Sequence, residues 1–179
     1  MNKKMISVTF NKEKITLLLN IEVERSAIDK VSGEALSRKL LPKDEFHITL
    51  IGNSMGEIIK ENISQLSMGD QTKILLKIEN LVNEFSWNFM LKDEYYYVSK
   101  TYPKTADFEE EKRESIIELI ELDDANKFYV RLNELLDTNF VLPFPHITLF
   151  TNSSREDRVL YGIGIASEED LRSLKPERV

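Results

Sequence analysis

Residues 47–57 read HITLIGNSMGE, and residues 146–156 read HITLFTNSSRE. The two stretches are identical at seven of eleven positions, and together they hold both histidines of the 179-residue chain. A Leu-Pro pair precedes each stretch, at Leu41-Pro42 and at Leu142-Pro143. This similarity indicates an internal duplication of a strand and its exit turn, with the two copies 99 residues apart.

Each copy begins with His-Ile-Thr-Leu, a composition that is typical of a β-strand. Successive side chains of a strand point to opposite faces, so His47 and Thr49 share one face while the Ile and Leu share the other. The aliphatic face is expected to contact the core, and the His–Thr face a cleft or solvent. The second copy predicts the same arrangement for His146 and Thr148.

The polar residues after each strand predict how the chain leaves it. Ser54-x-x-Glu57 and Ser153-x-x-Glu156 both fit a capping box that turns the chain off the strand. If the two copies pack about a pseudo-two-fold axis, the two His–Thr pairs face each other across one central groove.

Two facing His–Thr pairs suit acid–base chemistry on a phosphodiester. An imidazole has an ordinary pKa of about 6.5, so near neutral pH one can be neutral while the other is protonated. The neutral ring accepts a proton from the attacking hydroxyl or water, and the protonated ring donates one to the leaving oxygen. The Thr49 and Thr148 hydroxyls can donate hydrogen bonds to the non-bridging oxygens. This chemistry requires no metal and no cofactor.

The paired His-x-Thr motifs resemble those of the 2H phosphoesterase superfamily, which includes the 2′-5′ RNA ligase-like proteins and cyclic phosphodiesterases. The resemblance implies a bilobal α+β fold with a central groove. It also implies metal-independent hydrolysis or transesterification of RNA-type phosphodiesters, with His47, Thr49, His146 and Thr148 as the functional residues. The sequence thus predicts catalysis by His47 and His146, with Thr49 and Thr148 binding the substrate.

The expected substrate is a 2′,3′-cyclic phosphate or a 2′-5′ phosphodiester of a small nucleotide or an RNA end. A cyclic dinucleotide or cyclic oligonucleotide is a narrower variant. The alternative from another class is a non-catalytic module that binds a nucleotide or phosphate in the same groove. The Thr and His of both copies favour the enzyme, because binding alone is served better by Arg or Lys.

Other side chains are candidates for the same groove. Lys43, Arg155 and Arg158 could contact phosphate, although exposed solubilising charges are the simpler interpretation. One of the three consecutive tyrosines at 95–97 could stack on a base, while strand alternation turns at least one of them to the core.

Charge is distributed unevenly along the chain. The 24 basic and 31 acidic side chains give a formal net charge of −7. Residues 107–124 hold nine acidic and two basic side chains, which accounts for the whole imbalance. The simplest interpretation of this segment is the solvated face of a helix. The remainder is neutral, which suits a small or terminal phosphodiester better than a long nucleic acid.

Several classes of protein and site are excluded. With no cysteine, the chain has no disulfide, no thiol nucleophile and no Cys-based metal site. Gly162-Ile163-Gly164 does not continue as a dinucleotide-binding fingerprint, and there is no P-loop. The apolar run at 15–23 is too short to span a bilayer. We expect a monomeric cytoplasmic protein without membrane contact.

The remaining patterns predict the α+β class for one bilobal domain over residues 1–179, because strands and helices interleave without a regular βαβ rhythm. The strands are expected at 5–10, 15–23, 45–51, 86–91, 94–100, 146–151 and 159–165. The helices are expected at 25–40, around 58–66, around 74–85, in the acidic segment with Ile116, Ile117 and Ile120 on one stripe, over 128–136, and near 168–174.

Overall fold

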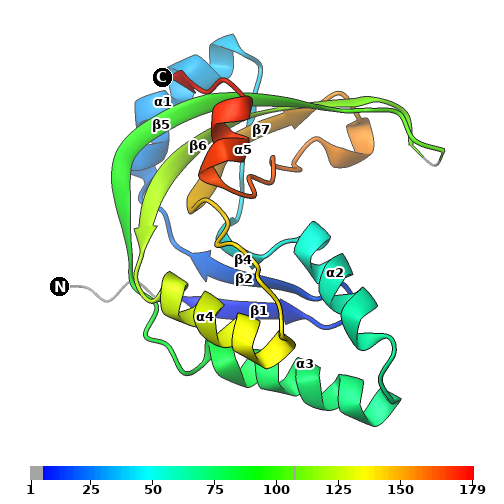
Figure 1. Ribbon diagram of the computed structural model, residues 1–179. Coiled ribbons are helices and arrows are strands. Elements are labelled where there is room, and N and C mark those ends of the chain that lie inside the picture. Colours follow the sequence, from blue (N-terminus) through cyan, green and yellow to red (C-terminus); the bar gives the residue numbers. More distant parts are fainter. Residues whose placement is uncertain (1–5, 107) are drawn as a thin grey trace.

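Two antiparallel sheets and five α-helices make up the computed structural model, which describes residues 6–106 and 108–179 (Figure 1). The predicted α+β class with antiparallel sheets is confirmed. The strands are β1 (Ser7–Asn11), β2 (Thr16–Ile21), β3 (Leu41–Pro42), β4 (Phe46–Ile51), β5 (Phe89–Tyr102), β6 (Glu111–Leu122), β7 (His146–Ser153) and β8 (Glu177–Arg178). The helices are α1 (Arg25–Ser37), α2 (Asn53–Ile63), α3 (Met68–Val82), α4 (Ala125–Leu136) and α5 (Glu168–Ser173), with a 3₁₀ turn η1 (Glu156–Arg158).

The smaller sheet has the strand order β1-β2-β4. Its first two strands form the predicted hairpin, in which the Asn11 side-chain oxygen accepts hydrogen bonds from the amides of Glu13 and Lys14. Local side-chain bonds of this kind favour a turn over a continuing strand. The predicted first strand includes Met5, which lies outside the described residues.

The larger sheet has the strand order β3-β7-β6-β5-β8. Its edge strand β3 lies just before β4 in the chain, yet it pairs with β7 through Leu41↔Thr151 and Pro42↔Phe150. The chain therefore crosses from one sheet to the other between β3 and β4. As a result the two motif strands, β4 and β7, lie next to each other although they belong to different sheets.

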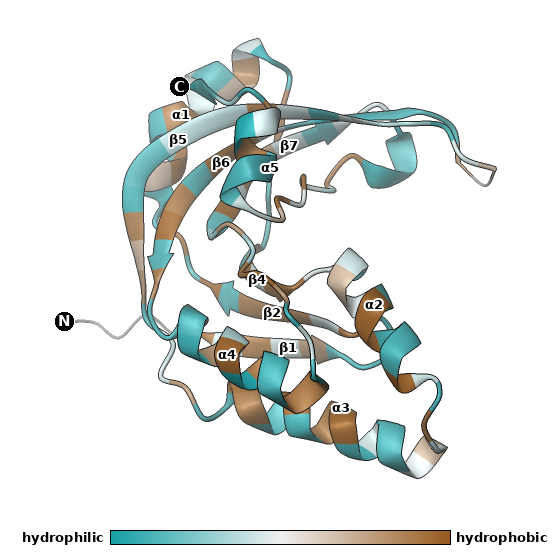
Figure 2. Ribbon diagram, viewed as in Figure 1, coloured by the Kyte–Doolittle hydropathy of each residue, from teal (hydrophilic) through white to brown (hydrophobic). Residues whose placement is uncertain are grey.

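Helices cover both sheets. In Figure 1, α3 and α4 lie below the smaller sheet, while α1 and α5 lie against the larger one. Figure 2 shows that α2, α3 and α4 each carry hydrophobic and hydrophilic residues, which is the pattern of helices with one buried face. The main core contains residues of both sheets, such as Leu19, Leu50 and Leu149. Within the described residues, every helix is too short or too polar to cross a membrane.

The helix predicted in the acidic segment is wrong, because Glu111–Leu122 forms the strand β6 in the middle of the larger sheet. Its residues from Ser115 to Ile120 are all buried, since both faces of this strand are covered. A strand buried on both faces gives a continuous apolar run, which periodicity alone cannot distinguish from a helix. Two of its acids are buried, since Glu111 and Glu118 are 3% and 1% exposed, whereas Glu121 is exposed.

The strand predicted at 159–165 is also wrong, because this segment is an extended loop that pairs with no strand. Buried and exposed residues do alternate in this segment, since Ile163 and Ile165 are buried in a second core cluster while Gly164 is exposed. The neighbouring strand β7 pairs with β6 on one side and, at Phe150 and Thr151, with β3 on the other.

Two further local predictions need correction. The strands expected at 86–91 and 94–100 are one strand, β5, with an irregularity at Asp93, whose φ of 58° is left-handed. Neither predicted capping box forms. Gly52 is the N-cap of α2, and the Ser153 hydroxyl bonds Glu111 within the sheet instead of capping a helix.

Candidate functional site

The four predicted site residues lie on two strands as the alternation predicts. His47 and Thr49 of β4 are half-buried, and the Ile and Leu between and after them are buried with 1% and 0% exposure. His146 and Thr148 of β7 are likewise half-buried, again with fully buried Ile and Leu neighbours. Each His–Thr pair therefore shares the face of its strand that points away from the main core.

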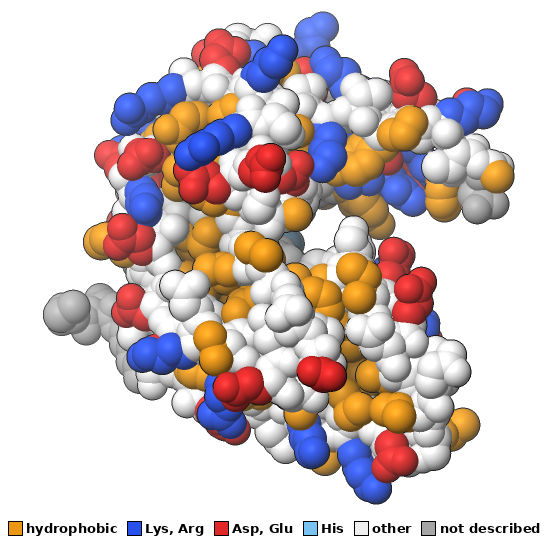
Figure 3. Space-filling view, in the orientation of Figure 1, with side chains coloured by type: hydrophobic (Ala, Val, Ile, Leu, Met, Phe, Trp, Pro, Cys, Tyr) orange, Lys and Arg blue, Asp and Glu red, His pale blue; other side chains and the backbone are white. Residues whose placement is uncertain are grey.

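The structure brings the two histidines within electrostatic range of each other. β4 and β7 are neighbours, and the pKa of His47 is lowered mainly by burial, then by the charge of Lys43, and also by that of His146. Figure 3 shows that the surface is hollowed between the part of the molecule that carries α5 and η1 and the part that carries α2. A pair of interacting imidazoles on adjoining strands is the arrangement that acid–base chemistry at one atom requires.

The environment of His146 determines its tautomer. Its Nδ1 lies 2.7 Å from the carbonyl oxygen of Phe144, and because a carbonyl can only accept, Nδ1 carries the hydrogen. Burial lowers the pKa of His146, while the backbone of Phe144 and Ile163 opposes that change by stabilising the protonated ring. Two backbone groups, those of Phe144 and Ile163, therefore act on this ring, and the first of them engages Nδ1.

His47 has a different environment, which is set by charges. Burial is the main cause that lowers its pKa, followed by the charge of Lys43 and then that of His146, while Glu45 raises it. The Lys43 ammonium donates a hydrogen bond of 2.8 Å to the carbonyl of Leu160. Lys43, one of the weaker sequence candidates, is therefore held in place near His47 and does not extend freely into solvent.

The loop Leu160–Ile163 lies against the site, and side chains from elsewhere in the chain bind its carbonyls. Lys43, Thr151 and Arg113 donate to the carbonyls of Leu160, Tyr161 and Gly162 at 2.8, 2.9 and 3.2 Å. The next residue, Ile163, is the one whose backbone acts on the His146 ring. These donors satisfy three of the loop's carbonyls in place of a strand partner.

Gly162 brings this loop into contact with Thr148. A Cβ atom at Gly162 would lie 2.9 Å from the Thr148 hydroxyl oxygen, closer than side chains tolerate without movement. A Cβ at Gly164 would meet nothing within 4 Å. Glycine at position 162 therefore leaves the space in which the Thr148 hydroxyl lies.

A buried ion pair anchors this loop to the larger sheet. Glu111 receives two hydrogen bonds from Arg113, at 2.5 and 3.0 Å, and a third from Ser153 at 2.8 Å. These partners lower the pKa of Glu111 to about 2, with Arg113 as the largest cause. The same Arg113 binds the Gly162 carbonyl, so the ion pair is connected to the site through the loop.

Sequence reasoning did not assign these loop and anchor residues to the site. The only signal was the Gly-Ile-Gly-Ile alternation after the second motif, which reads as a strand. Of the tyrosines at 95–97, Tyr95 is 6% exposed, which confirms that at least one faces the core. Arg155 and Arg158 are paired with Asp157 and only 21% and 26% exposed, so they are not simply solubilising charges.

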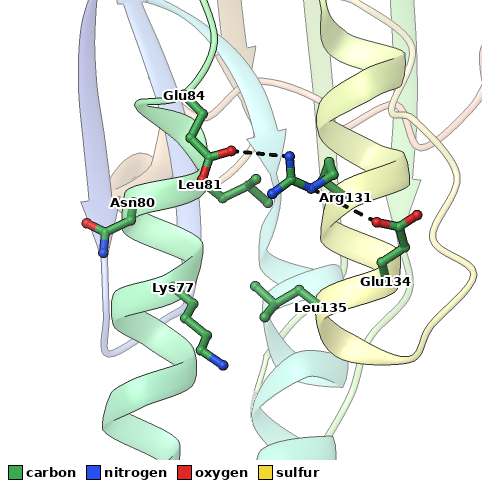
Figure 4. Close-up of a pocket in the computed structure, with 7 residues that line it drawn as sticks. All are labelled: Lys77, Asn80, Leu81, Glu84, Arg131, Glu134 and Leu135. Carbon is green, nitrogen blue, oxygen red and sulfur yellow. Dashed lines mark ion pairs between the residues drawn. The ribbon is translucent and has the colours of Figure 1, made fainter.

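A surface pocket with a volume of about 460 Å³ lies away from the motifs, between α3 and α4 (Figure 4). It is crossed by Arg131, which forms ion pairs of 3.3 Å with Glu84 and 4.0 Å with Glu134. The side chains of all three residues are more than half exposed, and the other charged side chain drawn in Figure 4, Lys77, forms no ion pair with them. We do not assign it as the functional site.

The described residues do not bring three His, Asp or Glu side chains together as ligands for a metal ion. The groups that converge on the motif strands are two imidazoles, two hydroxyls and one ammonium, a set suited to proton transfer and to hydrogen bonding with an anion.

Comparisons of the chain with protein-family models, with curated proteins and with solved structures find no match. The function must therefore be argued from the site itself.

Proposed function

We propose that this chain is a metal-independent phosphodiesterase of the 2H type. It would hydrolyse a 2′,3′-cyclic phosphate or a 2′-5′ phosphodiester of a small nucleotide or RNA end. The observation that carries the proposal is the placement of His47 and His146 on the neighbouring strands β4 and β7, each with a threonine two residues later on the same face. The hollow in Figure 3 would receive the substrate between the two copies of the motif, as a pseudo-two-fold arrangement requires.

The reaction needs one neutral and one protonated imidazole. The neutral ring removes a proton from water as the water oxygen attacks phosphorus, and the protonated ring donates its proton to the leaving ribose oxygen. The P–O bond to that oxygen breaks, and a 2′,3′-cyclic phosphate opens to a phosphate monoester and a hydroxyl. The net change is the addition of one water molecule.

The remaining groups would act on the phosphate oxygens. The Thr49 and Thr148 hydroxyls would donate to the non-bridging oxygens, where negative charge increases in the transition state. The Lys43 ammonium, which already acts on His47, would add positive charge at the same end of the site.

The alternative is a module that binds a nucleotide or phosphate without turnover. Burial lowers the pKa of both His47 and His146, which disfavours the charged form of the rings that would attract an anion. A proton-transfer pair has a use for such rings, whereas a phosphate-binding module is served better by Arg or Lys. The lowered pKa values therefore favour catalysis.

Hydrolysis of 2′,3′-cyclic nucleotides and 2′-5′ dinucleotides with EDTA present tests the proposal. We expect turnover by the wild type and a fall of about 10²–10⁴-fold in kcat for His47→Ala and for His146→Ala, the usual contribution of a general acid or base. Thermal unfolding of both variants serves as the control for folding. Activity that survives both substitutions would contradict the mechanism, and tight binding without turnover by the wild type would favour the module.

A further inference from the structure

Three aromatic rings and three guanidinium groups alternate in an unbroken row beside the site. We call this row the aromatic–arginine ladder. It runs in the order Tyr102, Arg113, Tyr161, Arg158, Phe108 and Arg155. The successive guanidinium-to-ring distances are 4.5, 5.4, 5.5, 5.0 and 5.1 Å. All five lie within the range of a cation–π contact.

Carboxylates hold the arginines of the ladder by their edges. Glu111 binds Arg113 through both of its oxygens and reaches Arg158 at 3.5 Å. Asp157 binds Arg155 through two hydrogen bonds of 3.0 and 2.8 Å. Three guanidinium groups face two carboxylates, so the ladder keeps one positive charge in a chain whose net charge is −7.

Two of the three rings of the ladder are open to solvent. Tyr161 is 51% exposed and Phe108 is 48% exposed, while the Arg158 between them is 26% exposed. Figure 3 shows hydrophobic and basic side chains together along the upper rim of the hollow. Rings that served only to pack against neighbouring side chains would contribute more to stability if they were covered.

The ladder is continuous with the motif site through the chain itself. Tyr161 directly precedes Gly162, which contacts Thr148, and its carbonyl is bound by Thr151 of the motif strand β7. A nucleotide that extends along this loop from a phosphodiester at Thr148 would reach Tyr161.

We propose that the aromatic–arginine ladder is a second nucleotide subsite, in which a base lies against the exposed parts of the Tyr161 and Phe108 rings next to the scissile phosphodiester. Nucleobases stack on aromatic rings and on guanidinium planes, and the surplus positive charge attracts the adjoining phosphate. The preferred substrate is then a short oligonucleotide and not a mononucleotide. This inference rests on the proposed function, because that function places the scissile phosphodiester at the motif strands.

The test compares two substrates that differ only in the presence of further nucleotides. One is a 2′,3′-cyclic mononucleotide, and the other is a tetraribonucleotide ending in the same 2′,3′-cyclic phosphate. For Tyr161→Ala and Phe108→Ala we expect kcat/KM to fall about 5- to 150-fold with the tetranucleotide, the usual effect of one lost base stack, and to change little with the mononucleotide. Tyr161→Phe keeps the ring and should retain activity, and Val130→Ala, at an exposed site on α4, controls for a general surface effect.

Binding gives a reading that does not depend on turnover. The probe is a fluorescein-labelled tetraribonucleotide with a 3′-phosphate, and its Kd should rise for Tyr161→Ala but not for Tyr161→Phe. An equal loss of kcat/KM on both substrates, or an unchanged Kd in Tyr161→Ala, would overturn the subsite. If the wild type hydrolyses neither substrate but the Kd still responds to Tyr161→Ala, the proposed activity fails while the subsite stands.

Discussion

The two copies of the eleven-residue motif have the same first half and different second halves. In both, His and Thr lie half-buried on one face of a strand while Ile and Leu are buried on the other. After the fourth residue the copies diverge. The first continues into the helix α2, whereas the second remains a strand up to Ser153 and then forms the 3₁₀ turn η1.

One pair of equivalent positions illustrates this divergence. Gly56 in the first copy corresponds to Arg155 in the second. Gly56 is buried where α2 lies against the β1–β2 turn, and a Cβ there would lie 2.3 Å from the Lys14 carbonyl oxygen. Arg155 stands at the outer end of the aromatic–arginine ladder. The shared half thus carries the proposed chemistry, while one variable half packs the core and the other forms the ladder.

The strongest test of the shared half is removal of its hydroxyls. Thr49→Val and Thr148→Val keep the shape of the side chain and remove the donor, so we expect each to lower kcat by about 10²–10³-fold, as for an oxyanion donor. Hydrolysis of a 2′,3′-cyclic nucleotide measures this, with Thr101→Val at an exposed position on β5 as the control. A large loss in only one of the two variants would show that the copies are not equivalent in the reaction.

The loop behind the second copy is tested by a pair of glycines. In Gly162→Ala the new methyl group meets the Thr148 hydroxyl, and displacement of that group is expected to lower kcat/KM by up to ~10²-fold. Gly164→Ala adds a methyl group that meets nothing within 4 Å, and its activity should match the wild type. Equal activity of the two variants would show that the loop does not position the Thr148 hydroxyl for the reaction.

The helix after the first copy is tested by stability. Gly56→Ala forces α2 away from the Lys14 and Ile15 carbonyls and is expected to lower the free energy of unfolding by about 1–3 kcal/mol, as overpacking does. Gly33→Ala lies in α1 with open space around it and should raise that free energy by about 1 kcal/mol through helix propensity. Urea unfolding of both variants measures the difference. A Gly56→Ala protein as stable as the wild type would mean that this contact does not constrain the helix.

The smallest expected effect concerns the unlike environments of the histidines. Because the pKa values of both lie below the ordinary 6.5, the state with one protonated ring is most populated in mildly acidic solution, and kcat/KM should be bell-shaped with its maximum below pH 6.5. Lys43→Gln removes a charge that lowers the pKa of His47, so that pKa should rise while that of His146 changes less. NMR titration of the two imidazoles measures this, and equal responses would place Lys43 near both rings.

The same groups determine how stability depends on pH. A histidine whose pKa is lowered on folding stabilises the native state above its unfolded pKa, and this contribution is lost as the pH falls. Glu111, whose pKa falls to about 2, stabilises the fold above about pH 4.5 and loses that contribution on acidification toward pH 2. Acid should therefore weaken the anchor of the Leu160–Ile163 loop together with the rest of the fold.

Much of the site could be predicted because it depends on neighbours in sequence. Alternation along four residues places His and Thr on one face whatever the strand pairs with, and repetition identified the second copy without any structure. The hairpin at Asn11–Lys14 and the helices α1 to α5 also follow from local patterns. The strand β6 did not, because its apolar run is compatible with a helix until coverage of both faces is known.

The sequence by itself determined the α+β class, the two His–Thr pairs and the absence of thiol chemistry. Only the tertiary structure decided that β4 and β7 adjoin, and that Lys43, Arg113 and Thr151 converge on the Leu160–Ile163 loop. It likewise assembled the ladder from the end of β5, from β6 and the connection before it, and from the residues after β7. The physical reason is the range of the interactions: alternation and turns depend on adjacent residues, whereas these contacts join residues as far as 117 positions apart in the chain.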